Sequence, residues 1–281
     1  MKQRIFTAIL ILTVSLLVVG FSGYIIYPIA ISILAVIGVF EILRVMKSHK
    51  HFAFSIPAYI LAALFPILPF FTTEEDVGGF LLILAGSMFV YLIWIMGVAI
   101  FSKGKIPFSR IAEVFTSVVY VTVSFTALSL LRYINRGSGV FAVVLVFVVA
   151  WICDVFAYLV GVTIGKHKLI PEISPKKTVE GSIGGILFTA LFCGLYGLGL
   201  DLIMENMTVN YPVLIIGGAI LSVVSQLGDL VASLIKREYD VKDYSRIFPG
   251  HGGVMDRFDS VLSVSTALLI IFIIYPPFVM N

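Results

Sequence analysis

The chain has 281 residues, of which 60% are hydrophobic and only 12% charged, and its mean hydropathy is +1.10. Apolar runs of about 20 residues, the length that crosses a bilayer, recur along it, and no polar segment is long enough to build a soluble domain. The net charge of +3 is too small to indicate nucleic-acid binding. Cys153 and Cys193 lie in apolar runs without a CxxC metal spacing, which predicts two buried thiols.

These runs predict an all-α, polytopic integral membrane protein with about nine transmembrane helices. The expected spans are 6–21, 24–43, 52–71, 78–100, 111–131, 140–162, 182–200, 213–235 and 261–279. The first run is interpreted as a retained span, because a second run follows at once and a convincing signal-peptide cleavage site is missing. We predict an N-terminal membrane domain of about five spans at 1–135 and a C-terminal catalytic membrane domain of about four spans at 136–281.

The distribution of basic residues predicts the orientation. With a cytoplasmic N-terminus, all but two of the 19 lysines and arginines, namely Arg132 and Arg136, fall on the inner side. This is the bias expected of cytoplasmic loops. The polar segments 165–185 and 233–259 then face the cytoplasm, where nucleotides are found.

The first five spans carry little chemistry. Their prolines predict kinks or span ends, where neighbouring helices satisfy the freed backbone groups. These prolines are Pro28, Pro57, Pro66 and Pro69. Glu41 and Glu113 lie near cytoplasmic span ends and are interpreted as interfacial carboxylates.

The sixth span carries Asp154, with Tyr158 one turn later and Gly161 and Gly165 at a spacing that lets helices approach closely. A carboxylate this deep predicts either a site or a hydrogen bond to a neighbouring helix.

The loop after this span predicts a phosphate site. Lysines and hydroxyls gather in it, and glycines at the start of the next helix allow the backbone to approach a ligand. The candidate binding residues are Ser174, Lys176, Lys177 and Thr178, and the glycines are Gly181, Gly184 and Gly185. The alternative is that the lysines bind anionic lipid headgroups.

The eighth span carries a single polar stripe on an otherwise apolar helix. Its members, at spacings of three and four residues, are Ser222, Gln226, Asp229, Ser233 and Lys236. The stripe predicts a cleft with Asp229 at its base and Lys236 and Arg237 at its mouth. The alternative is a stripe that only bonds neighbouring helices.

The segment 233–259 is a charged island between two apolar runs, and we interpret it as the active site. Its 249–253 turn, which contains His251, Gly252 and Gly253, leaves amides free to face an anion. Asp256 and Asp259 share a helix face, and oxygen ligands of this kind predict a hard cation such as Mg²⁺ or Mn²⁺. The alternative is a solvated helix start favoured by the helix dipole. Arg257 points elsewhere and is expected to hold a phosphate.

The island resembles the signature of the phosphatidate cytidylyltransferases (CDP-diacylglycerol synthases). The matching residues are Ser233, Lys236, Arg237, Lys242, Asp243, His251, Gly252, Gly253, Asp256, Arg257 and Asp259. The loop with 174–178, Glu180 and Gly181, preceded by Asp154 and Tyr158, is similar to a second block of that family.

The resemblance implies an enzyme that joins CTP to phosphatidic acid, giving CDP-diacylglycerol and pyrophosphate, with Mg²⁺ and an optional second metal ion as cofactor. It implies Asp229, Asp256 and Asp259 as metal ligands, and catalytic roles for Asp229, Asp256, Lys236 and Arg237. Phosphates would be held by Lys177, Lys236, Arg237, Arg246 and Arg257, with Asp154, Ser174, Lys176, Thr178, Lys242, His251, Gly252 and Gly253 as further substrate contacts. A homodimer in a bacterial inner (cell) membrane, with the active site facing the cytoplasm, is also implied.

Two alternatives remain at this stage. The first is a related CTP-dependent enzyme, either a polyprenol or phytol kinase, which would release CDP instead of pyrophosphate, or a cytidylyltransferase for another lipid phosphate. A membrane transporter could also place Asp154 and Asp229 at mid-membrane. Against the transporter, the polar residues gather at one face, and the sequence contains no evident inverted repeat.

Overall fold

The structure, a computed structural model, describes residues 19–135, 137–248, 250 and 252–280. Its helices are α2 (Ile26–Val45), α3 (Phe52–Leu64), the 3₁₀ turn η1 (Leu68–Phe70), α4 (Val77–Phe101), α5 (Phe108–Tyr133), α6 (Gly139–Ile164), α7 (Val179–Ile203), α8 (Tyr211–Glu238) and α9 (Met255–Ile274). Within the described residues, eight helical segments are long and apolar enough to cross a membrane. The chain is therefore a polytopic membrane protein, and eight of the nine predicted spans are confirmed.

The first predicted span, 6–21, lies almost wholly outside the described residues. The total of nine and the cytoplasmic N-terminus therefore stay predictions.

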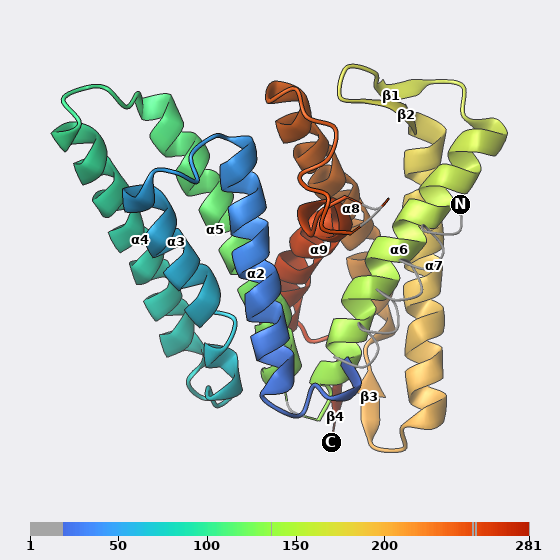
Figure 1. Ribbon diagram of the computed structural model, residues 1–281. Helices are drawn as coiled ribbons and strands as arrows, with labels where there is room; N and C mark the ends of the chain where they lie inside the picture. The colour runs from blue at the N-terminus through green and yellow to red at the C-terminus, as the bar shows by residue number, and fades with distance from the viewer. Residues whose placement is uncertain (1–18, 136, 249, 251, 281) are drawn as a thin grey trace. The chain divides into compact units, whose positions relative to one another are not determined.

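Two short sheets accompany the helices (Figure 1). Strands β1 (Lys168–Ile170) and β2 (Ser174–Thr178) form an antiparallel hairpin in the predicted phosphate loop. Strands β3 (Met207–Val209) and β4 (Phe278–Met280) pair antiparallel near the C-terminus.

The predicted limits differ most from the structure in two spans. The last helix starts at Met255 and not at 261, and it ends at Ile274 because 278–280 belong to β4. Helix α7 starts at Val179 and not at 182. Apolar composition does not distinguish a short buried strand from the end of a helix. It also places the start of a helix too late when the first turn contains polar residues, as in α7.

The chain divides into two compact units. The first unit comprises the described part of Met1–Ile134 together with Val241–Arg257, and the second comprises Asn135–Asp240 and Phe258–Asn281. The division falls within the first turn of α9. The domain boundary predicted at 135/136 stays a prediction.

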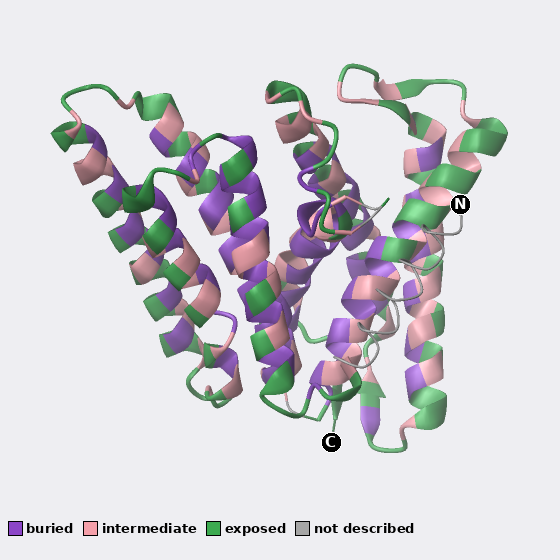
Figure 2. Cartoon of the chain, viewed as in Figure 1, coloured by how far each residue is buried: buried purple, intermediate pink, exposed green. Residues whose placement is uncertain are grey.

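In the first unit, α5 is the central helix and contacts α2, α3, α4 and η1. Helix α5 is mostly buried, whereas little of α4 is buried, and Figure 2 shows the many exposed residues of α4. The exposed side chains of α4 are large and apolar, such as Leu82, Phe89 and Phe101. In a membrane protein such side chains suit contact with lipid.

The predicted role of the prolines is confirmed at Pro57, which lies inside α3. Proline has no N–H, so the carbonyl four residues earlier, that of Ala53, loses its helical partner. The indole Nε1 of Trp94 on α4 donates to this carbonyl at 2.8 Å. Where the chain breaks between α3 and η1, Ser129 of α5 donates to the carbonyl of Pro66 at 2.6 Å.

In the second unit, α6 packs along α7, and α7 along α8. Glycines allow this close packing: a Cβ on Gly181 would lie 2.4 Å from the carbonyl oxygen of Ala157, and one on Gly184 would lie 2.6 Å from Val160. Gly181, Gly184 and Gly185 all face α6, so the expectation that they admit a ligand to the backbone is replaced by helix–helix packing.

Candidate active site

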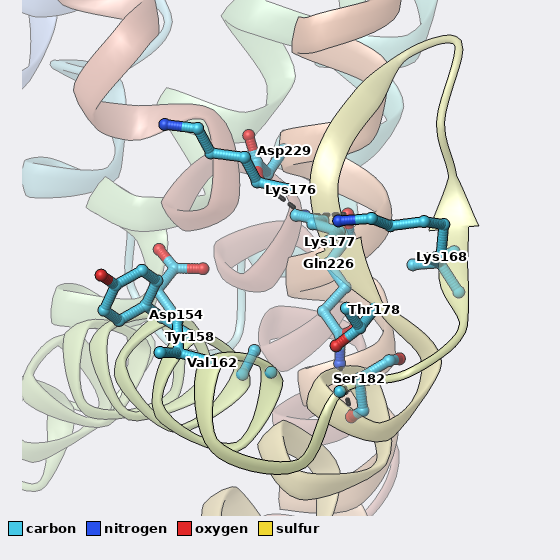
Figure 3. Close-up of a pocket in the computed structure, with 14 residues that line it drawn as sticks. Asp154, Tyr158, Val162, Lys168, Lys176, Lys177, Thr178, Ser182, Gln226 and Asp229 are labelled. Carbon is cyan, nitrogen blue, oxygen red and sulfur yellow. Dashed lines mark hydrogen bonds and ion pairs between the residues drawn. The ribbon is translucent and has the colours of Figure 1, made fainter.

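A cavity of about 550 Å³ lies in the second unit, and Figure 3 shows the side chains around it. Its walls are the C-terminal half of α6, the β1–β2 hairpin, the first turn of α7 and the middle of α8. Its polar lining residues are Asp154, Tyr158, Lys168, Lys176, Lys177, Thr178, Ser182, Gln226 and Asp229. The volume falls in the range of roughly 300–1,000 Å³ that holds small-molecule ligands.

The charges in this cavity suit a polyanionic ligand. Three lysines reach it from the hairpin, and two carboxylates, Asp154 and Asp229, reach it from α6 and α8. Lys177 Nζ forms an ion pair with Asp229 Oδ2 at 2.6 Å and lies 3.4 Å from the carbonyl oxygen of Gln226. The predicted loop lysines and the predicted base of the cleft are therefore brought together.

The hairpin is held in place where it enters α7. Thr178 caps this helix, because its hydroxyl accepts a hydrogen bond from the Gly181 N–H at 3.1 Å. A Cβ on Gly165 would lie 2.3 Å from the carbonyl oxygen of Gly161, so the end of α6 turns tightly onto the strand. The loop that the sequence predicts as a phosphate cradle is thus a hairpin from which Lys168, Lys176 and Lys177 line the cavity.

The polar stripe of α8 serves two purposes. Ser222 donates to Cys153 Sγ at 3.1 Å, and Gln226 Nε2 donates to the Ser182 carbonyl at 3.2 Å, so both bond neighbouring helices. Gln226 also lines the cavity with Asp229, one turn further along. Gln226 thus fits both interpretations of the stripe, whereas Lys236 and Arg237, which were expected at the mouth of the cleft, are not among the residues that line the cavity. Further along still, Arg237 Nε donates to the carbonyl of Ile173 in the hairpin turn at 3.4 Å.

Asp229 and Asp259 approach each other where α8 passes close to α9. The contact is at Gly228, whose added Cβ would lie 2.3 Å from Ser263 Oγ and 2.7 Å from the Asp259 carbonyl oxygen. The Asp259 carboxylate interacts electrostatically with those of Asp229 and Asp154 and with Lys236. Like charges gathered in this way favour a cation between them.

We expect Gly228→Ala to separate these carboxylates and to lower both stability and activity. The new methyl group must displace backbone, and overpacking of this kind costs about 1–3 kcal/mol of the free energy of unfolding. Thermal unfolding of the purified protein measures the effect. Gly199→Ala is the matched control, because a Cβ there meets nothing within 4 Å. Equal melting temperatures for the two variants would contradict the close approach.

Asp256 lies in the first unit, at the start of α9, and organises the turn before it. Its Oδ2 accepts the backbone N–H of Tyr244 at 2.8 Å and that of Gly253 at 2.9 Å. Gly252 has φ +84°, and a Cβ there would lie 2.6 Å from the same oxygen. The two glycines therefore wrap the turn around this carboxylate. The amides predicted to face an anion include that of Gly253, which faces Asp256.

The described residues include a pair of carboxylates that could hold a hard cation, but no group of three. Among residues 19–280, with 136, 249 and 251 set aside, no three His, Cys, Asp and Glu side chains gather as a metal site. Mg²⁺ is commonly held by one or two carboxylates together with substrate phosphates and water. Asp229 and Asp259 supply two such carboxylates in the second unit, so their donor chemistry fits this ion.

Comparison with known proteins assigns the family. Residues 2–275 match the Cytidylyltransferase family. The chain is 36% identical over 276 residues to the phosphatidate cytidylyltransferase of Staphylococcus epidermidis, covering 97% of this chain and 99% of that protein. Those of Staphylococcus aureus and Staphylococcus saprophyticus are 36% and 37% identical over the same shares of each chain. The chain belongs to the cytidylyltransferase family.

The resemblance stated from the motifs is therefore confirmed, while the role of each motif residue in this cytidylyltransferase stays a prediction. Six predicted site residues belong to the second unit's cavity or its hairpin: Asp154, Ser174, Lys176, Lys177, Thr178 and Asp229. Six belong to the first unit: Lys242, Arg246, Gly252, Gly253, Asp256 and Arg257. His251 lies outside the described residues.

Three residues that this reasoning left out of the site are placed by the structure. Lys168 lines the cavity from β1, and Ser182 from the first turn of α7. Glu41 of α2 was interpreted as an interfacial carboxylate, but it is fully buried against the predicted catalytic segment. In the sequence, the one feature that could have drawn attention to Glu41 is its place three residues before Arg44, the first basic residue at the end of that span. Glu113, by contrast, pairs with Arg110 at 3.4 Å on the surface, as an interfacial carboxylate should.

Proposed function

We propose that this cytidylyltransferase transfers the CMP group of CTP to phosphatidate, giving CDP-diacylglycerol and pyrophosphate for phospholipid synthesis. The similarity to phosphatidate cytidylyltransferases extends over nearly the whole of both chains. The observation that carries the proposal is the cavity that joins three lysines to Asp154 and Asp229. Nucleotidyl transfer needs this combination, because its transition state spreads negative charge over phosphate oxygens.

The proposed reaction is an attack of one phosphate on another. An ionised oxygen of the lipid phosphate attacks the α-phosphorus of CTP, a new P–O bond forms, and the bond to the β-phosphate oxygen breaks. Pyrophosphate leaves on the side opposite the attacking oxygen and takes the electron pair of the broken bond. A covalent enzyme intermediate is unnecessary, because phosphatidate is already a nucleophile. Positioning and charge stabilisation are then the main tasks of the protein.

The lysines of the hairpin are the proposed triphosphate contacts. Lys177 forms an ion pair with Asp229. A phosphate that binds the Lys177 ammonium group would replace Asp229 in this pair and leave the carboxylate free to bind another cation. Lys168 and Lys176 reach the same cavity. Lys236, Arg237, Arg246 and Arg257 are proposed to hold the remaining phosphate charge, including that of the lipid.

Mg²⁺ is the proposed cofactor, with Asp229, Asp256 and Asp259 as its ligands. Bound there, the ion would neutralise phosphate charge and polarise the α-phosphorus. Asp229 and Asp259 already interact electrostatically, which supports a cation beside this pair.

We further propose a homodimer in the inner (cell) membrane of a bacterium, with the cavity open to the cytoplasm. The relatives named above come from bacteria, and nearly all basic residues fall on one predicted side. On that side CTP enters from water, while phosphatidate reaches the site from the bilayer.

The test is the product released by purified protein with CTP, Mg²⁺ and phosphatidate. Pyrophosphate in equal amount to CDP-lipid is the expected result. CDP released from a lipid alcohol would reassign the chain as a kinase, and the absence of turnover with any lipid would favour a transporter.

A further inference from the structure

Glu41 is a fully buried carboxylate in the last turns of α2, and the reaction described above leaves it without a role. Its Oε1 accepts the hydroxyl of Ser245 at 2.5 Å and the backbone N–H of Val254 at 3.0 Å. Its Oε2 accepts the N–H of Met255 at 2.8 Å. An ionised carboxylate can only accept hydrogen bonds, and three donors converge on this one from a single segment.

The segment that Glu41 holds is the one that carries Asp256. Met255 is the first residue of α9 and Val254 precedes it, so Glu41 satisfies N–H groups at a helix start, where negative charge is favourable. The bonded positions lie more than 200 residues apart in sequence. Glu41 therefore caps α9 from a different helix.

The turn before α9 is clamped between two carboxylates. A Cβ on Gly253 would lie 2.3 Å from Glu41 Oε1, so a larger residue here would have to displace the Glu41 carboxylate. The N–H of the same residue bonds Asp256 Oδ2 at 2.9 Å. Asp256 and Glu41 therefore accept the N–H groups of consecutive residues, Gly253 and Val254.

A second residue of α2 ties down the other end of the segment. Arg44, three residues after Glu41, donates from Nη2 to the carbonyl of Tyr244 at 2.6 Å. The N–H of Tyr244 donates to Asp256 Oδ2. Asp256 is thus held through both of its backbone donors by residues that α2 fixes.

We propose that Glu41 is a positioning residue: by bonding Ser245, Val254 and Met255 it fixes the orientation of the Asp256 carboxylate. The inference rests on the proposed function, in which Asp256 is a metal ligand. It assigns a task to α2, a helix to which the reaction proposed above gives no other role. Groups that orient metal ligands without touching the metal change its affinity by roughly 10- to 100-fold when they are replaced.

The test is Glu41→Gln, which keeps the shape of the side chain but replaces one acceptor by an NH₂ donor that opposes a backbone N–H. Hydrogen exchange of residues 242–257 measures the hold on the segment without any turnover. Titration with Mn²⁺, followed by electron paramagnetic resonance, measures metal affinity. We expect faster exchange confined to this segment and a dissociation constant for Mn²⁺ raised by about 10- to 100-fold. Glu41→Asp should recover part of both losses.

Glu113→Gln is the control, because Glu113 is a half-exposed carboxylate on the neighbouring α5 that pairs with the half-exposed Arg110. It should match the wild type in both measurements. If Glu41→Gln does not fold, Ser245→Ala removes one donor and leaves the carboxylate, with an expected change of about 3- to 10-fold in exchange.

Two outcomes decide the matter. Wild-type exchange and Mn²⁺ affinity in Glu41→Gln would overturn the positioning role, whatever the reaction turns out to be. Faster exchange in 242–257 together with weaker Mn²⁺ binding supports it, even if the wild type transfers no CMP and the proposed function fails.

Discussion

Asp229→Asn is expected to lower CMP transfer by at least ~100-fold, because it removes charge at the base of the lysine-lined cavity. The carboxylate pairs with Lys177 and interacts with Asp259, and an amide of the same shape does neither as strongly. Initial rates of CDP-lipid formation at saturating CTP measure the loss. Metal affinity should fall with the rate.

Asp201→Asn is the matched control for this substitution. Asp201 is also a carboxylate on a spanning helix, but it accepts a hydrogen bond from Tyr211 OH and lines no part of the cavity. Its rate should stay close to that of the wild type. If Asp229→Asn were equally active, Asp229 would serve only as the structural partner of Lys177.

Asp256→Asn is expected to have a similarly large effect for a different structural reason. Asparagine retains a carbonyl oxygen that can accept the N–H groups of Tyr244 and Gly253, so the turn before α9 should persist. Only the negative charge is lost. We expect at least a ~100-fold lower rate with a melting temperature near that of the wild type.

Asp256→Ala completes the comparison, since it removes both the charge and the acceptor. It should lose the same activity and also melt at a lower temperature, because two buried N–H groups are left without their partner. An active Asp256→Asn beside an inactive, unstable Asp256→Ala would show that this residue shapes the turn and does not act in the reaction.

Much of the architecture could be predicted because spans of about 20 apolar residues leave a strong signal. Spans such as 78–100 and 140–162 were located to within two residues at each end. The polar stripe of α8 could be predicted for a similar reason, since helical spacing places Gln226 and Asp229 on one face. Lys176 and Lys177 were assigned to a phosphate site by composition, and the structure places both around a cavity with Asp229.

The hairpin itself could not be predicted, because short polar strands leave no clear alternation. Nor could β4, since 278–280 are as apolar as the helix before them. The roles of the glycines depend on partners in other helices: Gly228 meets Ser263, and Gly253 meets Glu41. Glu41 was missed for the same reason, because a carboxylate near a span end is usually interfacial, and only the fold brings Val254 and Met255 to it.

Transfer of label from CTP into lipid tests the central claim most directly. The purified protein is given phosphatidate, Mg²⁺ and CTP labelled with ³²P at either the α- or the γ-phosphate. We predict that α-label appears in a CDP-lipid and γ-label in pyrophosphate. Lipid that carries γ-label, or no labelled lipid at all, would contradict the assignment of CMP transfer to this chain.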